Sequence, residues 1–251
     1  MATAQTLLNN VLRGLRRDIV ATDSTTNSYH MLLLQFLNVA KERLEEQWDW
    51  HALRTTVTLT VSAGTVEYAL TSAGPADVDV GDRARLLYER PARSSDELSN
   101  TTESSDRVAG SLPQVFDVTD ASEHRLIEIS PEQMERLHFT DSDETAVPTH
   151  FSLSRDADNM TIKLYPTPSG SRTVKLRFVI PQEGIPSTAT DLFILSIPSR
   201  PVWLSALIMA IEERGQEASR ETGAIEREYQ DALYLALDRE KIASDYTSYP
   251  I

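Results

Sequence analysis

Acids and histidines are the first candidates for chemistry in this chain, and the sequence contains no cysteine. This excludes a disulfide framework, Cys-ligated zinc and a thiol nucleophile. The histidines fall in separate predicted elements with no metal-ligand spacing between them: His30, His51, His124, His138 and His150. Catalytic motifs such as G-x-S-x-G, the P-loop and H-E-x-x-H do not occur. We therefore expect no catalytic residue, no metal site and no cofactor.

Two acidic segments are the remaining candidates for a reactive site. Residues 77–82 (DVDVGD) bring alternate carboxylates together as a Ca²⁺ loop does, but the glycine comes one position too early for an EF-hand and the final glutamate is missing. We interpret this segment as a loop between strands. Asp141, Asp143 and Glu144 could supply the paired carboxylates of a glycoside hydrolase. A solvated acidic loop is the simpler interpretation.

Two tryptophans end the second predicted helix. Trp48 falls on the apolar stripe of that helix, whereas Trp50 is two positions further and points elsewhere. We predict that Trp48 and Trp50 pack between two domains, because buried aromatic rings contribute large contact areas. Stacking on a sugar or a base is the alternative.

Charge and hydropathy restrict the partners. The chain has 24 Lys and Arg against 38 Asp and Glu, which gives a formal net charge of -14. Such a chain is poorly suited to tight, nonspecific binding of nucleic acid. No apolar run approaches the roughly 20 residues of a membrane span, and the first 20 residues alternate apolar and polar positions, unlike a secretory signal. We expect a soluble protein made in the cytosol.

Helical periodicity marks both ends of the chain. The first predicted helix has apolar residues on one stripe from Leu7 to Ile19, and the second has a stripe from Leu33 to Trp48 and runs to about Trp50. Charged residues occupy the expected solvent side of the second helix: Lys41, Glu42, Arg43, Glu45 and Glu46. Two more helices are expected after Ser199, separated by the polar segment 212–223.

The middle of the chain is predicted to be mainly strands. Residues 57–61 and 66–70 alternate apolar and polar side chains around Ala63-Gly64, which predicts a hairpin. Further strands are expected within 83–89, 125–129, 150–153, 160–165 and 173–180, forming an antiparallel sandwich or meander. A short helix interrupts them, because Ser130, Pro131 and Gln133 form a capping box.

Together these elements predict an α+β fold, with a helical bundle from both chain ends and an inserted antiparallel β domain. The expected helical domain is discontinuous and comprises residues 1–53 and 198–251, of which 244–251 form an extended C-terminal tail. The β-rich domain is expected to span residues 54–197.

This order of elements resembles the head-to-tail adaptor proteins of short-tailed bacteriophages, also called tail tubular or head-completion proteins. The matching segments are LLNNVLRGLRRDIV, LEEQWDWHAL, TVTLTVSAGTVEYAL, EISPEQMERL, PTHFSLS and MTIKLYPTPSGSRTVKLRFVIP, followed by the closing helices. The resemblance covers most of the chain.

The resemblance implies a structural virion protein with no enzymatic activity, made in the host cytoplasm and placed at the head–tail junction. It implies a homo-oligomeric ring, a dodecamer, that docks on the portal protein, extends the DNA channel and holds tail nozzle or fibre proteins. Genomic DNA would pass through the ring without tight binding, and no membrane is involved. A virion-associated carbohydrate-binding module or cell-wall hydrolase is the alternative.

Two groups of residues are expected to contact these partners. The C-terminal segment of such adaptors reaches the portal, and the corresponding residues are Tyr246, Thr247, Ser248, Tyr249, Pro250 and Ile251. The segment 212–223 has almost no large apolar residue and is predicted at a subunit boundary or exposed rim. Its candidate residues are Glu212, Glu213, Arg214, Glu217 and Arg220.

Overall fold

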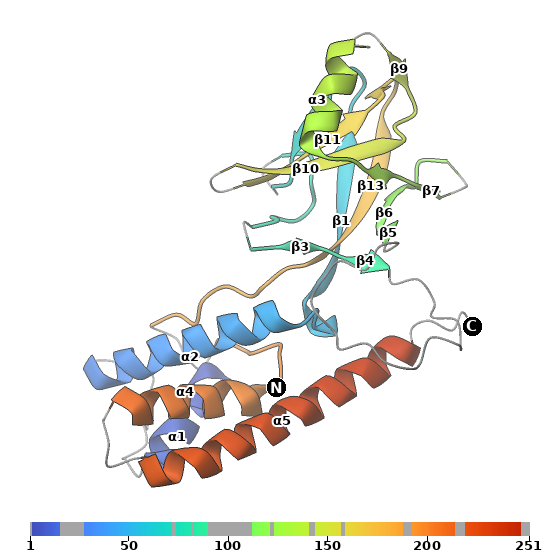
Figure 1. Cartoon of the computed structure of the whole chain (residues 1–251). Coiled ribbons are helices and arrows are strands. Elements are labelled where there is room, and N and C mark those ends of the chain that lie inside the picture. Colours follow the sequence, from blue (N-terminus) through green and yellow to red (C-terminus); the bar gives the residue numbers. More distant parts are fainter. Residues whose placement is uncertain are drawn as a thin grey trace. The chain divides into compact units, whose positions relative to one another are not determined.

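The computed structural model describes residues 2–15, 28–71, 74–81, 83–89, 112–120, 123–140, 144–156, 159–187, 192–213 and 219–246. The chain forms two compact units, one made of residues 1–53 and 181–251 and the other of residues 54–180. The first unit is helical and the second consists mainly of strands (Figure 1). The structure groups residues 181–197 with the helices, whereas the sequence analysis placed them in the β-rich part.

The helical unit is arranged around α4. Its elements are α1 (Ala4–Gly14), α2 (Ser28–Gln47), the 3-10 helix η1 (His51–Leu53), α4 (Ser199–Glu213) and α5 (Ser219–Tyr246). Helix α4 packs against α1, α2 and α5, which explains why its sequence is apolar on every side. Gly14 permits the approach of α1, since a Cβ there would lie 2.7 Å from Cδ2 of Leu207 on α4.

Helix α1 begins where its sequence provides a cap. The Oγ1 atom of Thr3 accepts a hydrogen bond from the backbone N–H of Thr6 at 3.3 Å, which satisfies one of the free donors of the first turn. The apolar stripe that follows is buried, and Leu7 is fully inaccessible. Backbone bonds join this end to the returning segment, because Ala4 donates to the carbonyl of Phe193 and Leu195 donates to that of Ala2.

The β-rich unit contains two larger sheets and two pairs of short strands. The larger sheets have the orders β1-β13-β6-β7, with β3 also beside β13, and β2-β11-β10-β8; the short pairs are β12-β9 and β4-β5. The strands are β1 (Arg54–Val61), β2 (Glu67–Ala69), β3 (Arg85–Leu86), β4 (Tyr88–Glu89), β5 (Leu112–Pro113), β6 (Val115–Asp117), β7 (His124–Arg125), β8 (Ile127–Glu128), β9 (Thr145–Ala146), β10 (His150–Asp156), β11 (Asn159–Tyr165), β12 (Thr167–Pro168) and β13 (Arg172–Val179).

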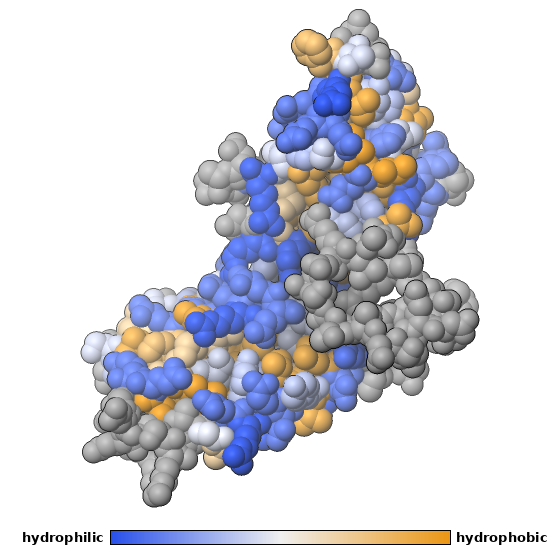
Figure 2. All heavy atoms as spheres, viewed as in Figure 1, coloured by the Kyte–Doolittle hydropathy of each residue, from blue (hydrophilic) through white to orange (hydrophobic). Residues whose placement is uncertain are grey.

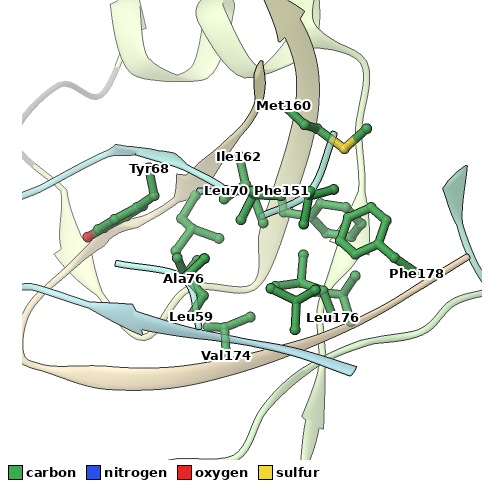
Figure 3. Packing of buried hydrophobic residues seen from close by; sticks show 14 of the residues in the cluster. Leu59, Tyr68, Leu70, Ala76, Phe151, Met160, Ile162, Val174, Leu176 and Phe178 are labelled. Atoms are coloured by element: carbon green, nitrogen blue, oxygen red, sulfur yellow. The ribbon is translucent and has the colours of Figure 1, made fainter. Parts of the chain in front are cut away.

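The core of this unit comes from the facing sides of the two larger sheets. Leu59 of β1 and Leu176 of β13 are fully buried, as are Phe151 of β10 and Ile162 of β11. Figure 3 shows these side chains directed towards one another. Burying each such side chain contributes about 1.5–3 kcal/mol, so the alternation of β1 and β13 is sufficient to fix which face of the sheet is internal.

Helix α3 (Pro131–Thr140) lies against β10 and β11 and is part of the β-rich unit. The predicted capping box is confirmed: Gln133 N–H donates to Oγ of Ser130 at 3.2 Å, and Ser130 N–H donates to Oε1 of Gln133 at 3.3 Å. Met134 is fully buried under this helix.

The expected bundle from both chain ends with an antiparallel insert is wrong, although the fold is α+β. Among the described elements, α1, α2 and α5 each pack against α4, α1 also contacts α2, and α3 lies against the strands β10 and β11. The sheet of β2, β11, β10 and β8 is mixed, because β8 runs parallel to β10, and the short pair β12-β9 is parallel, whereas the sheet that contains β1 and β13 is antiparallel. Periodicity identifies the buried side of an element, but long-range packing chooses its neighbour and their relative direction.

The predicted hairpin of residues 57–70 is also wrong. The chain does turn at Gly64, whose φ is 74°, but β1 pairs with β13 and β2 pairs with β11. The turn therefore carries the chain from one sheet to the other. The hydroxyl of Tyr68 holds it there, donating to the carbonyls of Ser62 and Thr65 at 2.8 and 2.7 Å.

Candidate docking surfaces

Three polar side chains on one stripe of α2 hold the segment that returns from the β-rich unit. Asn38, Lys41 and Glu45 are three and four residues apart, so they lie on the same side of the helix. We call them the α2 clamp. Asn38 pairs with the backbone of Ile185 in both directions, accepting its N–H at 2.6 Å and donating to its carbonyl at 3.2 Å.

The other two members of the clamp form a buried ion pair. Lys41 and Glu45 are both fully inaccessible, with Nζ and Oε2 3.2 Å apart. Both also hold Gln182: the ammonium donates to its carbonyl at 2.7 Å, and Glu45 accepts its N–H at 3.2 Å. Every charge in this pair thus has a backbone partner, which is the condition under which a buried ion pair is tolerated.

The prediction that Lys41 and Glu45 lie on the solvent side of the second helix is wrong. In a sequence, charged residues at helical spacing look the same whether water or another segment of the same protein supplies their hydrogen-bond partners. Gln182 and Ile185 contact this side of α2, and they are between 137 and 147 residues away in the sequence. The alignment of Asn38, Lys41 and Glu45 on one stripe was the available clue.

The two predicted packing tryptophans make contacts within the helical unit. Trp50 is 2% exposed, and its indole Nε1–H donates to the carbonyl of Leu44 at 2.7 Å. Trp48 is half-buried, with the ammonium of Lys241 on α5 lying 6.0 Å from its ring centroid. These contacts fix the end of α2 against α5, and the packing of either ring between domains stays a prediction.

A groove of about 640 Å³ lies between α2, α4 and α5. Its more buried residues are Ile208, Met209 and Tyr229, and its exposed edge carries charges of both signs. Hydrophobic residues emerge between α2 and α5 on the face seen in Figure 2. The lining residues are Arg43, Gln47, Ser205, Ile208, Met209, Glu212, Glu226, Arg227, Tyr229, Gln230 and Asp231.

Tyr229 supplies a hydroxyl to this groove. Burial raises the pKa of Tyr229, while the nearby charge of Arg43 acts in the opposite direction. The net shift is upward, so the hydroxyl stays protonated at neutral pH and can donate a hydrogen bond. A partly apolar interior with hydroxyl donors from Ser205 and Tyr229 and a charged edge is suited to a segment of another protein.

A second polar cluster lies at one end of the β-rich unit. Asp117 is 1% exposed, accepts a hydrogen bond from the hydroxyl of Thr119 at 2.6 Å and pairs with Arg172 at 2.7 Å. Burial alone would raise the pKa of Asp117, but the hydrogen bonds from Thr119 and the charge of Arg172 lower it overall. The ion pair between Asp117 and Arg172 links β6 to β13.

The acidic segments do not come together as a reactive centre in the described part of the chain. Asp77 lies beside β1, where its Oδ1 accepts the N–H of Thr58 at 2.6 Å. Glu144 accepts the hydroxyl of Tyr165 at 2.6 Å, whereas Asp82, Asp141 and Asp143 lie outside the described residues. Within the described ranges, no group of three His, Asp or Glu side chains could hold a metal ion.

The predicted partner-binding residues are only partly described. Glu212 and Glu213 are exposed at the end of α4, and Glu212 lines the groove. Arg214 and Glu217 lie outside the described residues, as do residues 247–251 of the predicted portal-docking tail. Arg220 and Tyr246 belong to α5, but their side chains are not described.

Comparison with known families decides what kind of protein this is. The family of SU10 adaptor proteins matches residues 2–249. The chain belongs to this family. No curated protein matches the sequence.

Membership identifies a structural protein of the phage virion, in a family that is not a known enzyme family. The expected resemblance to phage head-to-tail adaptors is therefore confirmed. Of the helices in the described ranges, none has the length and apolar character required to cross a membrane.

Proposed function

We propose that this adaptor joins the head of a phage virion to its tail. Identical copies form a ring, a dodecamer, that docks on the portal protein, continues the DNA channel and holds the tail nozzle or fibres. The family match over residues 2–249 is the observation that carries this proposal. The division into two units supports it, because each unit offers its own surface to a different neighbour.

The C-terminal tail, residues 246–251, is the proposed contact with the portal. Its first residue, Tyr246, is the last residue of α5, a helix of 28 residues. The sequence Tyr-Thr-Ser-Tyr-Pro-Ile is more apolar than the helix before it, and a short apolar peptide gains affinity by filling a groove on a partner. The portal would provide that groove.

Deletion of residues 246–251 tests this contact. We expect the truncated adaptor to keep the helical circular dichroism of the full chain but to lose attachment to portal assemblies, measured by mass photometry of the mixture. The full chain is the control, and its failure to bind the portal would overturn portal docking altogether. Normal attachment by the truncated chain would overturn the role of the tail alone.

The ring contact is proposed to include the end of α4 and the groove beside it, with a neighbouring copy as the occupant. Glu212 is exposed at the edge of this groove, together with Arg43 and Arg227. Charges of both signs at this edge can pair with opposite charges on the next copy. Such pairing is needed because identical chains of net charge -14 otherwise repel one another.

Charge reversal tests the ring contact. We expect Glu212→Lys combined with Glu213→Lys to reduce the fraction of rings seen by mass photometry at least tenfold. The matched control is Glu132→Lys combined with Glu135→Lys on α3, where both glutamates are also exposed. Equal ring formation by both double variants would remove the reason for placing this contact at α4.

A further inference from the structure

The sheet formed by β1, β13, β6 and β7 has a largely apolar inner face, with the Asp117–Arg172 pair at one end of it, and a basic outer face. Side chains of a strand alternate between the two faces, so the register of β1 with β13 assigns each one. Val57 pairs with Leu176 and Leu59 pairs with Val174 on the buried side. The opposite positions are exposed at Thr56 and Thr60 of β1 and at Lys175 and Arg177 of β13.

The outward positions hold cations and hydroxyls. Lys175 and Arg177 of β13 are exposed, and Arg125 of β7 lies across the sheet, with its guanidinium 5.1 Å from the ring centroid of Phe116. We call this surface the basic face. A row of threonines borders it: Thr56, Thr58 and Thr60 on β1 and Thr173 on β13. None of the outward positions on these described strands holds an acid, and Asp77 lies at the edge beside Thr58.

This arrangement contrasts with the rest of the protein. The chain as a whole has 14 more acidic than basic residues, yet its exposed sheet face presents only basic and neutral side chains. Helix α3 covers the outer side of the other large sheet, through its contacts with β10 and β11. A concentration of positive charge on one exposed sheet face is the usual footprint of a polyanion-binding surface.

The composition of the basic face favours phosphate over a protein partner. The centres of protein interfaces are enriched in aromatic residues and depleted of lysine, whereas contacts to a DNA backbone come from Arg, Lys, Ser and Thr. Here the one aromatic ring, Phe116, is half-buried beside Arg125. Lys175 and Arg177 are two residues apart on one strand, which separates their backbone positions by about 6.6 Å. Both side chains can therefore reach phosphates along one edge of a DNA groove.

We propose that the basic face contacts the phosphate backbone of duplex DNA. The proposal rests on the adaptor function only because that function brings the protein to DNA. The contact itself needs a single chain and can be measured on it. Three cations that contact phosphates alone give weak, sequence-independent binding that salt reverses. Such a contact guides a moving duplex without trapping it.

Fluorescence anisotropy of a random-sequence 30-base-pair duplex with the full chain tests the proposal. With three phosphates neutralised, affinity should fall about 40-fold between 50 and 200 mM salt. Lys175→Gln combined with Arg177→Gln should lower affinity at 50 mM salt at least tenfold and reduce the salt dependence by about two thirds. Circular dichroism checks that this variant folds.

A matched variant separates the basic face from net charge. Lys163→Gln combined with Arg136→Gln removes the same charge from the same unit, at a lysine on β11 that lies 3.7 Å from Glu67 and an exposed arginine on α3. We expect its affinity for the duplex to stay within twofold of the unchanged chain.

Three results would overturn the proposal. The first is that the unchanged chain does not bind the duplex at 50 mM salt, and the second is that both double variants lose the same affinity for the duplex. The third is that the Lys175→Gln, Arg177→Gln variant forms fewer rings while no DNA binding is observed. The last result would assign the face to a protein contact. None of them concerns attachment to the portal, which is measured separately, so the adaptor function would stand or fall on its own experiment.

Discussion

Replacing Glu45 by glutamine tests whether the α2 clamp stabilises the helical unit. The substitution keeps the shape of the side chain and an oxygen that can accept the N–H of Gln182, but it removes the negative charge. The ammonium of Lys41 then remains in a site that is fully inaccessible, with its Nζ still 2.7 Å from the carbonyl of Gln182 but without the negative charge of Glu45 at 3.2 Å. The perturbation is therefore almost purely electrostatic.

The expected cost follows from the burial of both partners. Removing one member of a buried ion pair costs about 3–5 kcal/mol, since the other charge is left uncompensated. The retained hydrogen bond to Gln182 places Glu45→Gln near the lower end, about 3 kcal/mol. For a unit of this size that corresponds to a fall of roughly 10 °C in Tm.

Thermal unfolding followed by circular dichroism at 222 nm measures this effect, because the helical unit dominates that signal. Glu46→Gln is the matched control, since it changes the same charge on the next residue, which is exposed, and should alter stability by less than about 0.5 kcal/mol. If the two variants unfold at the same temperature, the ion pair does not stabilise the unit and the clamp is incidental.

Two further substitutions test the other buried polar contacts. Trp50→Phe should lower the free energy of unfolding by about 2 kcal/mol, because the carbonyl of Leu44 loses its indole donor, whereas Trp48→Phe should cost less than half as much. Urea titration of the two variants compares them. Asp117→Asn should lower stability by about 2 kcal/mol at neutral pH. Since the folded-state pKa of Asp117 lies below its ordinary value of 3.8, this stabilisation is present above that pH and is lost as pH falls through the folded-state pKa. The difference between unchanged protein and variant should therefore shrink in acid, and Asp120→Asn, at a carboxylate 60% exposed, should show neither effect. A pH-independent difference for Asp117→Asn would contradict the assigned cause of the shift.

Local signals in the sequence predicted local structure well. The capping box at Ser130 and Gln133 forms as expected, because both hydrogen bonds join residues three positions apart and need no distant partner. The alternation of β1 likewise marks Val57 and Leu59 as internal. Strands β5 and β6 were missed, since two or three residues are too short to show a period.

Pairing between elements could not be predicted in the same way. Gly64 produces the expected turn, yet the strands on either side of it join different sheets. A turn fixes the direction of the chain over a few residues, and the neighbour of each strand is selected by burial of whole faces. The groove of the helical unit depends on the same long-range choice, because α2, α4 and α5 contribute to it from distant parts of the chain.

The sequence by itself determined the positions of most helices and longer strands, the cap of α3, the lack of cysteine chemistry and the resemblance to phage adaptors. Only the tertiary structure decided that Lys41 and Glu45 are buried and bound to Gln182, that β8 runs parallel to β10, and that Lys175, Arg177 and Arg125 lie on one face of a sheet. Periodicity records which side of an element avoids water. Whether a charged side chain meets water, a backbone carbonyl or another cation depends on segments far away in the chain, and that information appears only when the segments pack.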